Sequence, residues 1–380
     1  MRSSMRLLTL GASAVFILSA CSGTTASAVP SVAPSVDASE APSESASASA
    51  SAGGGTVDYT ACVAFDTGGL GDKGFNDLAK KGLDDAKAAG YTTFFSEAQG
   101  ATDYASNIQR LIDQGCQSIV TVGFNQAQAT IDATKNNPEV AFAQVDAVWD
   151  ETTNGPTPAN FSGLDFQIDE AAMLAGYLAA GFSKSGKVGT YGGQQFPGVT
   201  RFMDGLYAGI KYHNEKKGTA VELLGWDAVA QTGTFVGGDN PWGDPAKGEQ
   251  LAGTLLDQGV DIVHPVAGAT GNGSLKAMLA AGKWGIGVDT DQALSLAEYA
   301  GAIITSAEKV IDVAVLETFK KNSGGDTGGE NFIGTLENKG VRISPFHDFE
   351  DDITAELKAE LGELETAIAG GSVKVADYLK

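Results

Sequence analysis

The fold is decided by the stretch Phe65-Asp66-Thr67-Gly68-Gly69-Leu70-Gly71-Asp72-Lys73-Gly74-Phe75-Asn76. An apolar run from Ala61 to Phe65 ends in it, four glycines follow, and an amphipathic helical pattern begins at about Phe75. This order predicts a strand, a tight turn and the start of a helix. In open α/β sheets ligands bind at the carboxyl ends of strands, so we expect one wall of a binding site here.

Strand and helix patterns alternate along the chain, which predicts an α/β fold with parallel sheets covered by helices. The first set has strand patterns at 59–65, 92–96, 118–123, 141–146 and 160–166. After a helical pattern at 168–182 the alternation starts again, with strand patterns at 187–192, 221–226, 262–266 and 285–288. Two successive sets predict two similar lobes, the first of which ends near Phe166.

In its last part, the chain is expected to cross back between the two lobes. It offers a short strand at 303–306, a helix at 307–320 with Lys309 in its first turn, an apolar run at 341–346 and a helix at 352–369. We therefore expect a first lobe of residues 58–166 plus about 303–335, and a second lobe of residues 167–302 plus about 336–380.

Composition excludes one class of partner. The chain has 380 residues, which is enough for two domains, and 43% of them are hydrophobic. Its formal net charge is −22, and the pI is about 4.4. Such an acidic surface repels the phosphate backbone, so we expect no nucleic-acid partner.

The N-terminus reads as a targeting signal. Arg2 and Arg6 precede an apolar segment at 7–20, which ends in Leu18-Ser19-Ala20-Cys21. This resembles the lipobox of bacterial lipoproteins, in which the cysteine becomes the lipidated first residue. Residues 1–20 would then be a signal peptide, Cys21 a membrane anchor on the extracytoplasmic face, and Ser/Ala/Pro-rich residues 21–57 a disordered tether. The alternative is an ordinary signal peptide with a chance cysteine.

Two further cysteines lie in the folded part. Cys62 is early in the first strand pattern, and Cys116 lies at the start of the stretch Gln117 to Val122 that contains the third. Cysteines of an exported chain often pair, and the first and third strands of a doubly wound sheet are neighbours. A disulfide between Cys62 and Cys116 is the favoured interpretation, and two buried free thiols are the alternative.

Gly69 to Gly74 also matches the dinucleotide fingerprint G-x-G-x-x-G, with Glu97 at a plausible distance after it. Three observations weigh against this interpretation. The chain carries an export signal, Asp72 would place a carboxylate where pyrophosphate should lie, and no catalytic partner is apparent. We therefore expect no cofactor, although the glycines could also serve the turn alone.

The sequence offers no catalytic or metal-binding constellation. His213, His264 and His347 are its only histidines, and none has metal-ligand spacing with another. No nucleophile-elbow motif or paired acids with a nearby base are present. We expect neither an enzyme nor a metal site.

Aromatic and acidic residues are candidates for a neutral ligand. Phe235 and Trp242 lie in a glycine-rich loop, where large rings lack a helix face to pack against. Asp289 and Asp291 follow a strand, and a carboxylate accepts two hydrogen bonds side by side, which suits a vicinal diol such as ribose. The alternative is that Asp291 caps the following helix. Lys309 could add a donor or be solvated.

A set of motifs in the same order resembles the basic membrane protein family of substrate-binding lipoproteins of ABC transporters, which includes purine nucleoside receptors. The resemblance covers about residues 59–380. It rests on Gly71-Asp72-Lys73-Gly74-Phe75-Asn76, Val122-Gly123-Phe124, the strand end at Asp146, Leu174 to Ala180, Gly186 to Gly189, Ala267 to Gly273 with Gly268, Gly287-Val288-Asp289-Thr290-Asp291-Gln292, and Thr305 to Lys309.

The resemblance implies a type I periplasmic-binding-protein fold, with two Rossmann-like lobes, a three-segment hinge and a ligand in the cleft. It implies a purine nucleoside as ligand and an ABC permease as partner. The ligand residues that it implies are Asp72, Phe75, Asn76, Phe124, Asp146, Phe235, Gly268, Asp289 and Lys309, with Phe235 as the second stacking ring. The segment 236–242 departs from the family pattern because it is longer and richer in glycine.

We therefore expect a lipid-anchored solute-binding protein, acting as a monomer, that closes on its ligand by hinge bending. Two alternatives stay open. The same fold could bind a sugar, because aromatic stacking and carboxylate–hydroxyl bonding serve sugars too. It could also act as a ligand sensor rather than as a component of transport.

Overall fold

The computed structural model describes residues 55–380. Its first sheet has six parallel strands in the order β13-β5-β4-β3-β1-β2. They are β1 (Thr60–Phe65), β2 (Thr92–Glu97), β3 (Ser118–Val122), β4 (Ala141–Val145), β5 (Phe161–Phe166) and β13 (Phe332–Gly334). The predicted signal peptide, Cys21 and nearly all of the predicted tether lie outside the described residues.

Helices cover both faces of this sheet because side chains of each central strand alternate between two apolar cores. Val63 and Phe65 of β1 face a core shared with α1 (Phe75–Ala88) and α10 (Ile311–Ser323). Cys62 and Ala64 face the opposite core, shared with α2 (Tyr104–Asp113) and α3 (Ala127–Asn136). A single turn, α4 (Glu151–Asn154), precedes β5.

Cys62 and Cys116 form a disulfide. It joins β1 to Cys116, two residues before β3, at the end of the sheet opposite the strand termini that face the cavity described below. The bond closes a loop with a sequence separation of 54 residues. In the chain-entropy account, a loop of this length stabilises the fold by about 4 kcal/mol, by restricting the unfolded state.

The second sheet repeats the plan with the order β14-β12-β11-β10-β6-β7. All neighbours are parallel except β12 and β14, which are antiparallel. The strands are β6 (Lys187–Gly192), β7 (Glu222–Leu224), β10 (Ile262–Val266), β11 (Trp284–Asp289), β12 (Ile303–Lys309) and β14 (Val341–Ile343). A small hairpin of β8 (Trp226–Asp227) and β9 (Thr232–Gly233) follows β7.

The helices of the second lobe are α5 (Ile168–Phe182), α6 (Pro197–Lys217), α7 (Pro245–Asp257), α8 (Ala269–Ala280), α9 (Gln292–Ser295) and α11 (Ala355–Ala369). Helices α5 and α6 pack very closely because glycines lie at their contact. A Cβ added at Gly176 would come within 2.2 Å of Leu206 O, and one at Gly209 within 2.1 Å of Met173 O. No helix among residues 55–380 is both long and apolar enough to cross a membrane.

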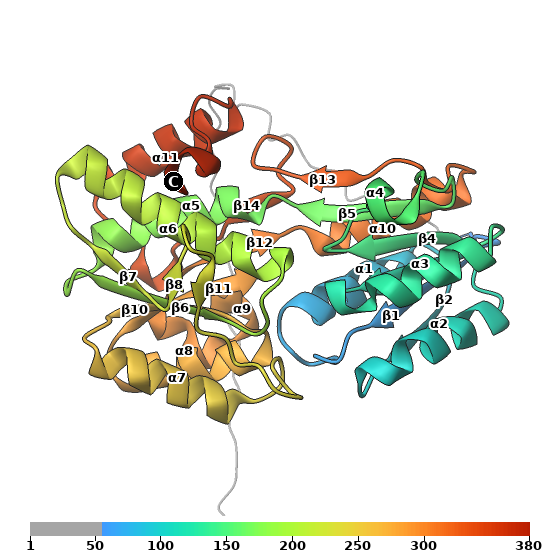
Figure 1. Ribbon diagram of the computed structural model, residues 1–380, viewed down its shortest axis with the longest axis horizontal. Coiled ribbons are helices and arrows are strands. Elements are labelled where there is room, and N and C mark those ends of the chain that lie inside the picture. Colours follow the sequence, from blue (N-terminus) through green and yellow to red (C-terminus); the bar gives the residue numbers. More distant parts are fainter. Residues whose placement is uncertain (1–54) are drawn as a thin grey trace, which may run out of the picture. The chain divides into compact units, whose positions relative to one another are not determined.

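The chain passes between the two lobes three times. The first crossing joins β5 to α5, the second joins β12 to α10, and the third joins β13 to β14. In Figure 1 the orange segments α10 and β13, from late in the chain, lie with the blue and green elements of the first sheet. The second crossing falls after Lys309, and not near residue 303 as the sequence predicted, because β12 pairs with β11 of the second sheet.

The prediction that a helix begins at residue 307 was wrong. Ala307, Glu308 and Lys309 are good helix formers, yet they continue β12, which is buried along its whole length. Pairing with β11 on one side and β14 on the other outweighs their intrinsic preference. The helix begins only at Ile311.

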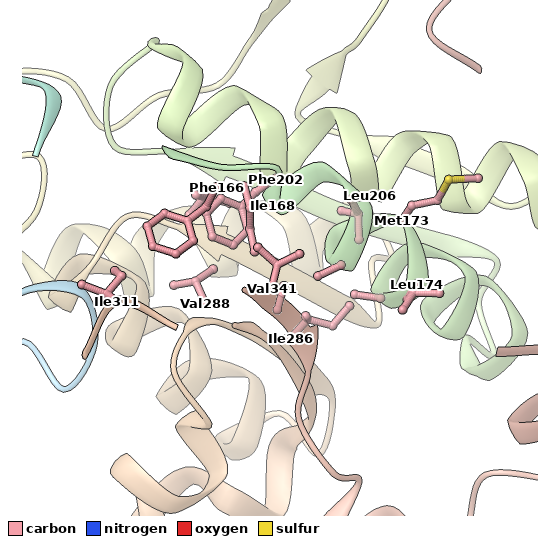
Figure 2. Close-up of a cluster of buried hydrophobic side chains, with 14 of the residues drawn as sticks. Phe166, Ile168, Met173, Leu174, Phe202, Leu206, Ile286, Val288, Ile311 and Val341 are labelled. Atoms are coloured by element: carbon pink, nitrogen blue, oxygen red, sulfur yellow. The ribbon is translucent and has the colours of Figure 1, made fainter. Parts of the chain in front are cut away.

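Figure 2 shows apolar side chains packed where the crossings meet. Phe166 and Ile168 flank the first crossing, Ile311 follows the second, and Val341 follows the third. All four belong to one buried cluster with residues of α5, α6 and β11. The three crossings are therefore packed together rather than being free linkers.

Candidate ligand-binding site

A cavity lies between the carboxyl ends of strands from both sheets. It encloses about 600 Å³, part of which is open to solvent. Its wall includes most of the predicted ligand residues, namely Asp72, Phe75, Asn76, Phe124, Asp146, Gly268, Asp289 and Lys309. It does not include Phe235. Residues from about 72 to 309 are thus brought to one place by the fold.

Asp72 occupies the N-terminus of α1, which excludes a phosphate from that position. Its carboxylate accepts hydrogen bonds from the backbone N–H groups of Gly74 (2.9 Å), Asn76 (2.8 Å) and Asp77 (3.2 Å). Burial raises its pKa, and these hydrogen bonds oppose that rise. The positive end of the helix is therefore already neutralised by a side chain of the protein itself.

Three further N–H groups of the glycine turn donate to acidic side chains. Glu97 accepts from Leu70 N at 3.1 Å, and Asp77 accepts from Gly71 N and Lys73 N at 2.8 and 3.1 Å. In a dinucleotide site these N–H groups would face pyrophosphate. Because acidic side chains already accept hydrogen bonds from these N–H groups, the groups are not available to bind pyrophosphate. Glu97 binds the backbone of the turn itself.

Asp146, Asp289 and Lys309 form the charged end of the cavity. Asp146 directly follows β4, and Asp289 is the last residue of β11. In the spatial order of the strands given above, each of these strands is the third of its sheet. Both aspartates have left-handed backbone angles, with φ of 62° and 65°. Lys309 Nζ lies 2.6 Å from Asp146 Oδ2 and 3.8 Å from Asp289 Oδ1. Left-handed angles are uncommon outside glycine and often mark functional positions, which fits the two aspartates.

One lysine fully neutralises only one of these two carboxylates. Lys309 is the only Lys or Arg among the described residues that line the cavity. Burial raises the pKa of Asp289 to about 7, and the charge of Lys309 opposes the rise. Burial also raises the pKa of Asp146. Since Asp146 holds the hydrogen bond to Lys309, Asp289 is the carboxylate left with capacity to accept from a ligand.

Aromatic rings line another part of the wall. Lys309 Nζ lies 5.3 Å from the ring centre of Phe75 and 5.0 Å from that of Phe202. Towards solvent, Phe124 of the first lobe stacks on Phe196 of the second, with ring centres 5.1 Å apart and planes inclined by 17°. Phe196 in turn contacts Trp242 at 5.7 Å.

The structure does not place Phe235 in the cavity. Its ring contacts Trp226 at 5.9 Å and covers Gly192, where a Cβ would come within 2.7 Å of it. Residues 234–236 pair with Gly192 beside β6, so the segment is a strand-like extension and not an open loop. The ring of the 233–242 segment that does line the cavity belongs to Trp242.

Several residues of the wall were not predicted as ligand residues, among them Asp66, Phe196 and Phe202, whereas Trp242 was a candidate from its place in a glycine-rich loop. Asp66 directly follows β1, as Asp146 follows β4, so its position at a strand end was a usable signal. Phe196 directly precedes α6 at the corresponding edge of the second sheet. Phe202 lies within α6, and nothing in its local sequence separates it from an ordinary core residue.

The two lobes touch on both sides of the cavity. Asn272 Nδ2 donates to Asp72 O at 3.1 Å, and Ser295 Oγ donates to Lys73 O at 2.8 Å. Next to the stacked phenylalanines, Asn125 Nδ2 donates to Gln194 Oε1 at 3.2 Å. The structure therefore represents a closed arrangement of the lobes.

Within residues 55–380, no three His, Cys, Asp or Glu side chains are placed to hold a metal ion. The cavity instead combines aromatic rings, carboxylates and one ammonium group. Such a wall suits a neutral organic molecule with hydroxyl or N–H donors.

Two lobes of parallel sheet, three crossings and an interlobe cavity define a solute-binding protein of the type I periplasmic fold. A solved solute-binding protein of an ABC transporter system from Aeropyrum pernix K1 superposes with a TM-score of 0.74 at 26% identity, covering 83% of this chain and 92% of that one. The chain belongs to the Bmp family of PnrA-like ABC transporter substrate-binding proteins, which residues 60–375 match.

Two relatives match over most of their length. One is the ABC transporter nucleoside-binding protein BmpA of Lactococcus lactis subsp. cremoris, with 30% identity over 84% of this chain and 89% of that protein. The other is basic membrane protein A of Borreliella burgdorferi, with 29% identity over 81% and 85%. The chain therefore has a substrate-binding role, with a small-molecule ligand and an ABC permease as partner.

Proposed function

We propose that this protein captures a purine nucleoside in the interlobe cavity and delivers it to an ABC permease. The observation that carries the proposal is the charged end of the cavity. There Asp289 has capacity to accept two hydroxyl hydrogen bonds, while Lys309 is held by Asp146. The aromatic wall beside it provides surfaces on which a base can stack.

Binding closes the hinge because the ligand contacts both lobes at once. Phe75 and Asn76 come from the first lobe, and Asp289 and Lys309 come from the second. A ligand that bridges them binds the closed state better than the open one, and so shifts the population towards closure. The name of the L. lactis relative supports a nucleoside as ligand.

We further propose that Cys21 anchors the protein to the outer face of the cell membrane. The support is the signal-like segment at 7–20 followed by Leu18-Ser19-Ala20-Cys21. Cells fed a radiolabelled fatty acid should label the wild-type protein and leave a Cys21→Ser variant unlabelled. Equal labelling of both would refute the anchor.

The ligand is tested by mass spectrometry of small molecules released when the purified protein is denatured, followed by calorimetry with adenosine, guanosine, inosine, cytidine and ribose. We expect the purine nucleosides to bind and ribose alone to bind at least about 100-fold more weakly, because it lacks the stacking base. Tight binding of ribose without binding of any purine nucleoside would favour the sugar alternative and exclude the proposed ligand.

A further inference from the structure

The backbone around Trp242 is held by hydrogen bonds within the second lobe. Its carbonyl oxygen accepts from Thr270 N at 3.0 Å. On its C-terminal side, Gly243 N donates to Asn240 Oδ1 at 3.0 Å, and Asp244 N donates to Thr270 Oγ1 at 2.8 Å. These bonds join the segment before α7 to the first turn of α8, so the tryptophan backbone has little freedom to move.

The indole ring of Trp242 is also held in place, by contacts with Gly193 and Phe196. One edge, which carries Cε3, Cζ3 and Cη2, lies against Gly193, where a Cβ would come within 2.2 Å of the ring. Phe196 contacts the ring at 5.7 Å. Across the cleft, a Cβ at Gly68 would lie 3.6 Å from Trp242 Cβ and 2.9 Å from Asn76 Nδ2. Trp242 therefore lines the cavity opposite the first lobe and close to Asn76.

The edge that faces away from Gly193 carries the polar atom of the ring. Trp242 Nε1 is buried and has no hydrogen-bond partner within residues 55–380. A buried N–H without a partner lowers stability, and a phenylalanine at 242 would fill similar space without this cost. The indole N–H is therefore expected to have a partner when the cavity is occupied.

A second unsatisfied atom lies in the same part of the wall. Asn76 Oδ1 is also buried without a partner among the described residues. Its Nδ2 donates to Asp72 Oδ2 at 3.1 Å, and Asp72 is fixed by the N-terminus of α1. Asn76 is thereby oriented as an acceptor, while Trp242 can act only as a donor. Both residues line the cavity, so a ligand that carries donors and acceptors is needed to satisfy both atoms.

We propose that Trp242 is a specificity-determining residue whose Nε1–H donates to a hydrogen-bond acceptor on the heterocycle of the ligand. The inference rests on the proposed nucleoside-binding function and deepens it. It selects bases that present a ring nitrogen or carbonyl lone pair at this edge. An analogue in which that acceptor is replaced by C–H binds more weakly, because Nε1 stays unpaired.

The test measures affinities of wild type and Trp242→Phe by calorimetry for adenosine and for its 1-deaza, 3-deaza and 7-deaza analogues. The variant keeps an aromatic ring but loses the donor. We expect adenosine to bind the variant about 10-fold more weakly. One deaza analogue, the one that lacks the acceptor addressed by Trp242, should bind wild type and variant equally.

Trp226→Phe is the matched control. Trp226 is also buried, but its Nε1 donates to Asp204 Oδ1 at 2.8 Å and it is not part of the cavity wall. This variant should keep wild-type affinity for adenosine within about 2-fold. Unchanged adenosine affinity in Trp242→Phe, or an equal loss for all three analogues, would overturn the role of Trp242 alone. Absence of nucleoside binding by the wild type would overturn the proposed function as well.

Discussion

Replacing Asp289 by asparagine is expected to weaken binding of a purine nucleoside by about 100-fold or more. The carboxylate would accept two hydroxyl hydrogen bonds, and each bond to a charged group contributes about 1.5–3 kcal/mol. An amide offers one acceptor oxygen and would turn a donor towards the second hydroxyl. Calorimetry with adenosine and 2′-deoxyadenosine measures the effect, and the deoxy compound should lose much less on substitution.

The same substitution is expected to stabilise the protein without ligand. The pKa of Asp289 is raised by burial from 3.8 to about 7, so its ionised form is disfavoured in the folded state. A shift of this size corresponds to at most about 4 kcal/mol of lost stability well above pH 7. Thermal unfolding of the ligand-free variant should therefore occur at a higher temperature than that of the wild type.

The pH dependence follows from the direction of the shift. A carboxyl group whose pKa is raised on folding stabilises the protein fully below its unfolded pKa, near 4, and this contribution is lost as the pH rises through 7. The advantage of Asp289→Asn should thus be small at pH 5 and largest above pH 8. Nucleoside affinity of the wild type should fall as the pH drops below 7, because Asp289 becomes protonated.

Asp291→Asn is the matched control. Asp291 precedes α9, but its carboxylate accepts no hydrogen bond from the first turn of that helix; its Oδ2 lies 2.6 Å from His347 Nε2, outside the cavity wall. We expect this variant to bind adenosine like the wild type. If Asp289→Asn also bound adenosine with wild-type affinity, Asp289 would not be the diol acceptor.

Replacing Lys309 by methionine is expected to destabilise the ligand-free protein by about 3–5 kcal/mol. Methionine fills similar space between Phe75 and Phe202, but it removes the ammonium group that neutralises Asp146. Two buried carboxyl groups, Asp146 and Asp289, would then lose the ammonium group that lies beside both of them. Denaturant unfolding at pH 7.5 measures the loss.

Acid should rescue this variant. Both carboxyl groups have raised pKa values, so they are the first to take up protons as the pH falls, and their repulsion disappears. We expect the loss of unfolding free energy in Lys309→Met to shrink at pH 5, and to shrink at pH 7.5 when Asp146→Asn is added.

Lys320→Met is the control, because Lys320 pairs with Glu317 on the exposed face of α10. This variant should change stability by less than about 0.5 kcal/mol. A deficit of Lys309→Met below about 1 kcal/mol would show that the two acids do not depend on this cation.

The strand ends were the part of the site that the sequence predicted best. Asp146 and Asp289 each lie at the end of a clear apolar run, and parallel strands bring their carboxyl ends to one edge of a sheet. Lys309 lines the cavity, but it lies on a strand and not on the predicted helix. The pairing that makes residues 307–309 a strand comes from β11 and β14, which no local pattern reveals.

The aromatic wall was harder to predict. The 233–242 segment has no periodicity, so nothing local shows that Phe235 packs on Gly192 while Trp242 reaches the cavity. The roles of Asp77 and Glu97 in the glycine turn were equally hard to predict. Asp77 and Glu97 look like ordinary residues of a helix and a strand, and only the folded turn shows that they bind its N–H groups.

The order in which the sheets receive their strands has a consequence for synthesis. β13 completes the first sheet at residues 332–334, and β14 completes the second at residues 341–343. A growing or shortened polypeptide that lacks these residues therefore leaves β5 and β12 as bare edges, open to pairing with other chains. Neither sheet is complete until these late residues have been made, so truncations that remove residues 332–343 should give aggregation-prone products rather than a functional half.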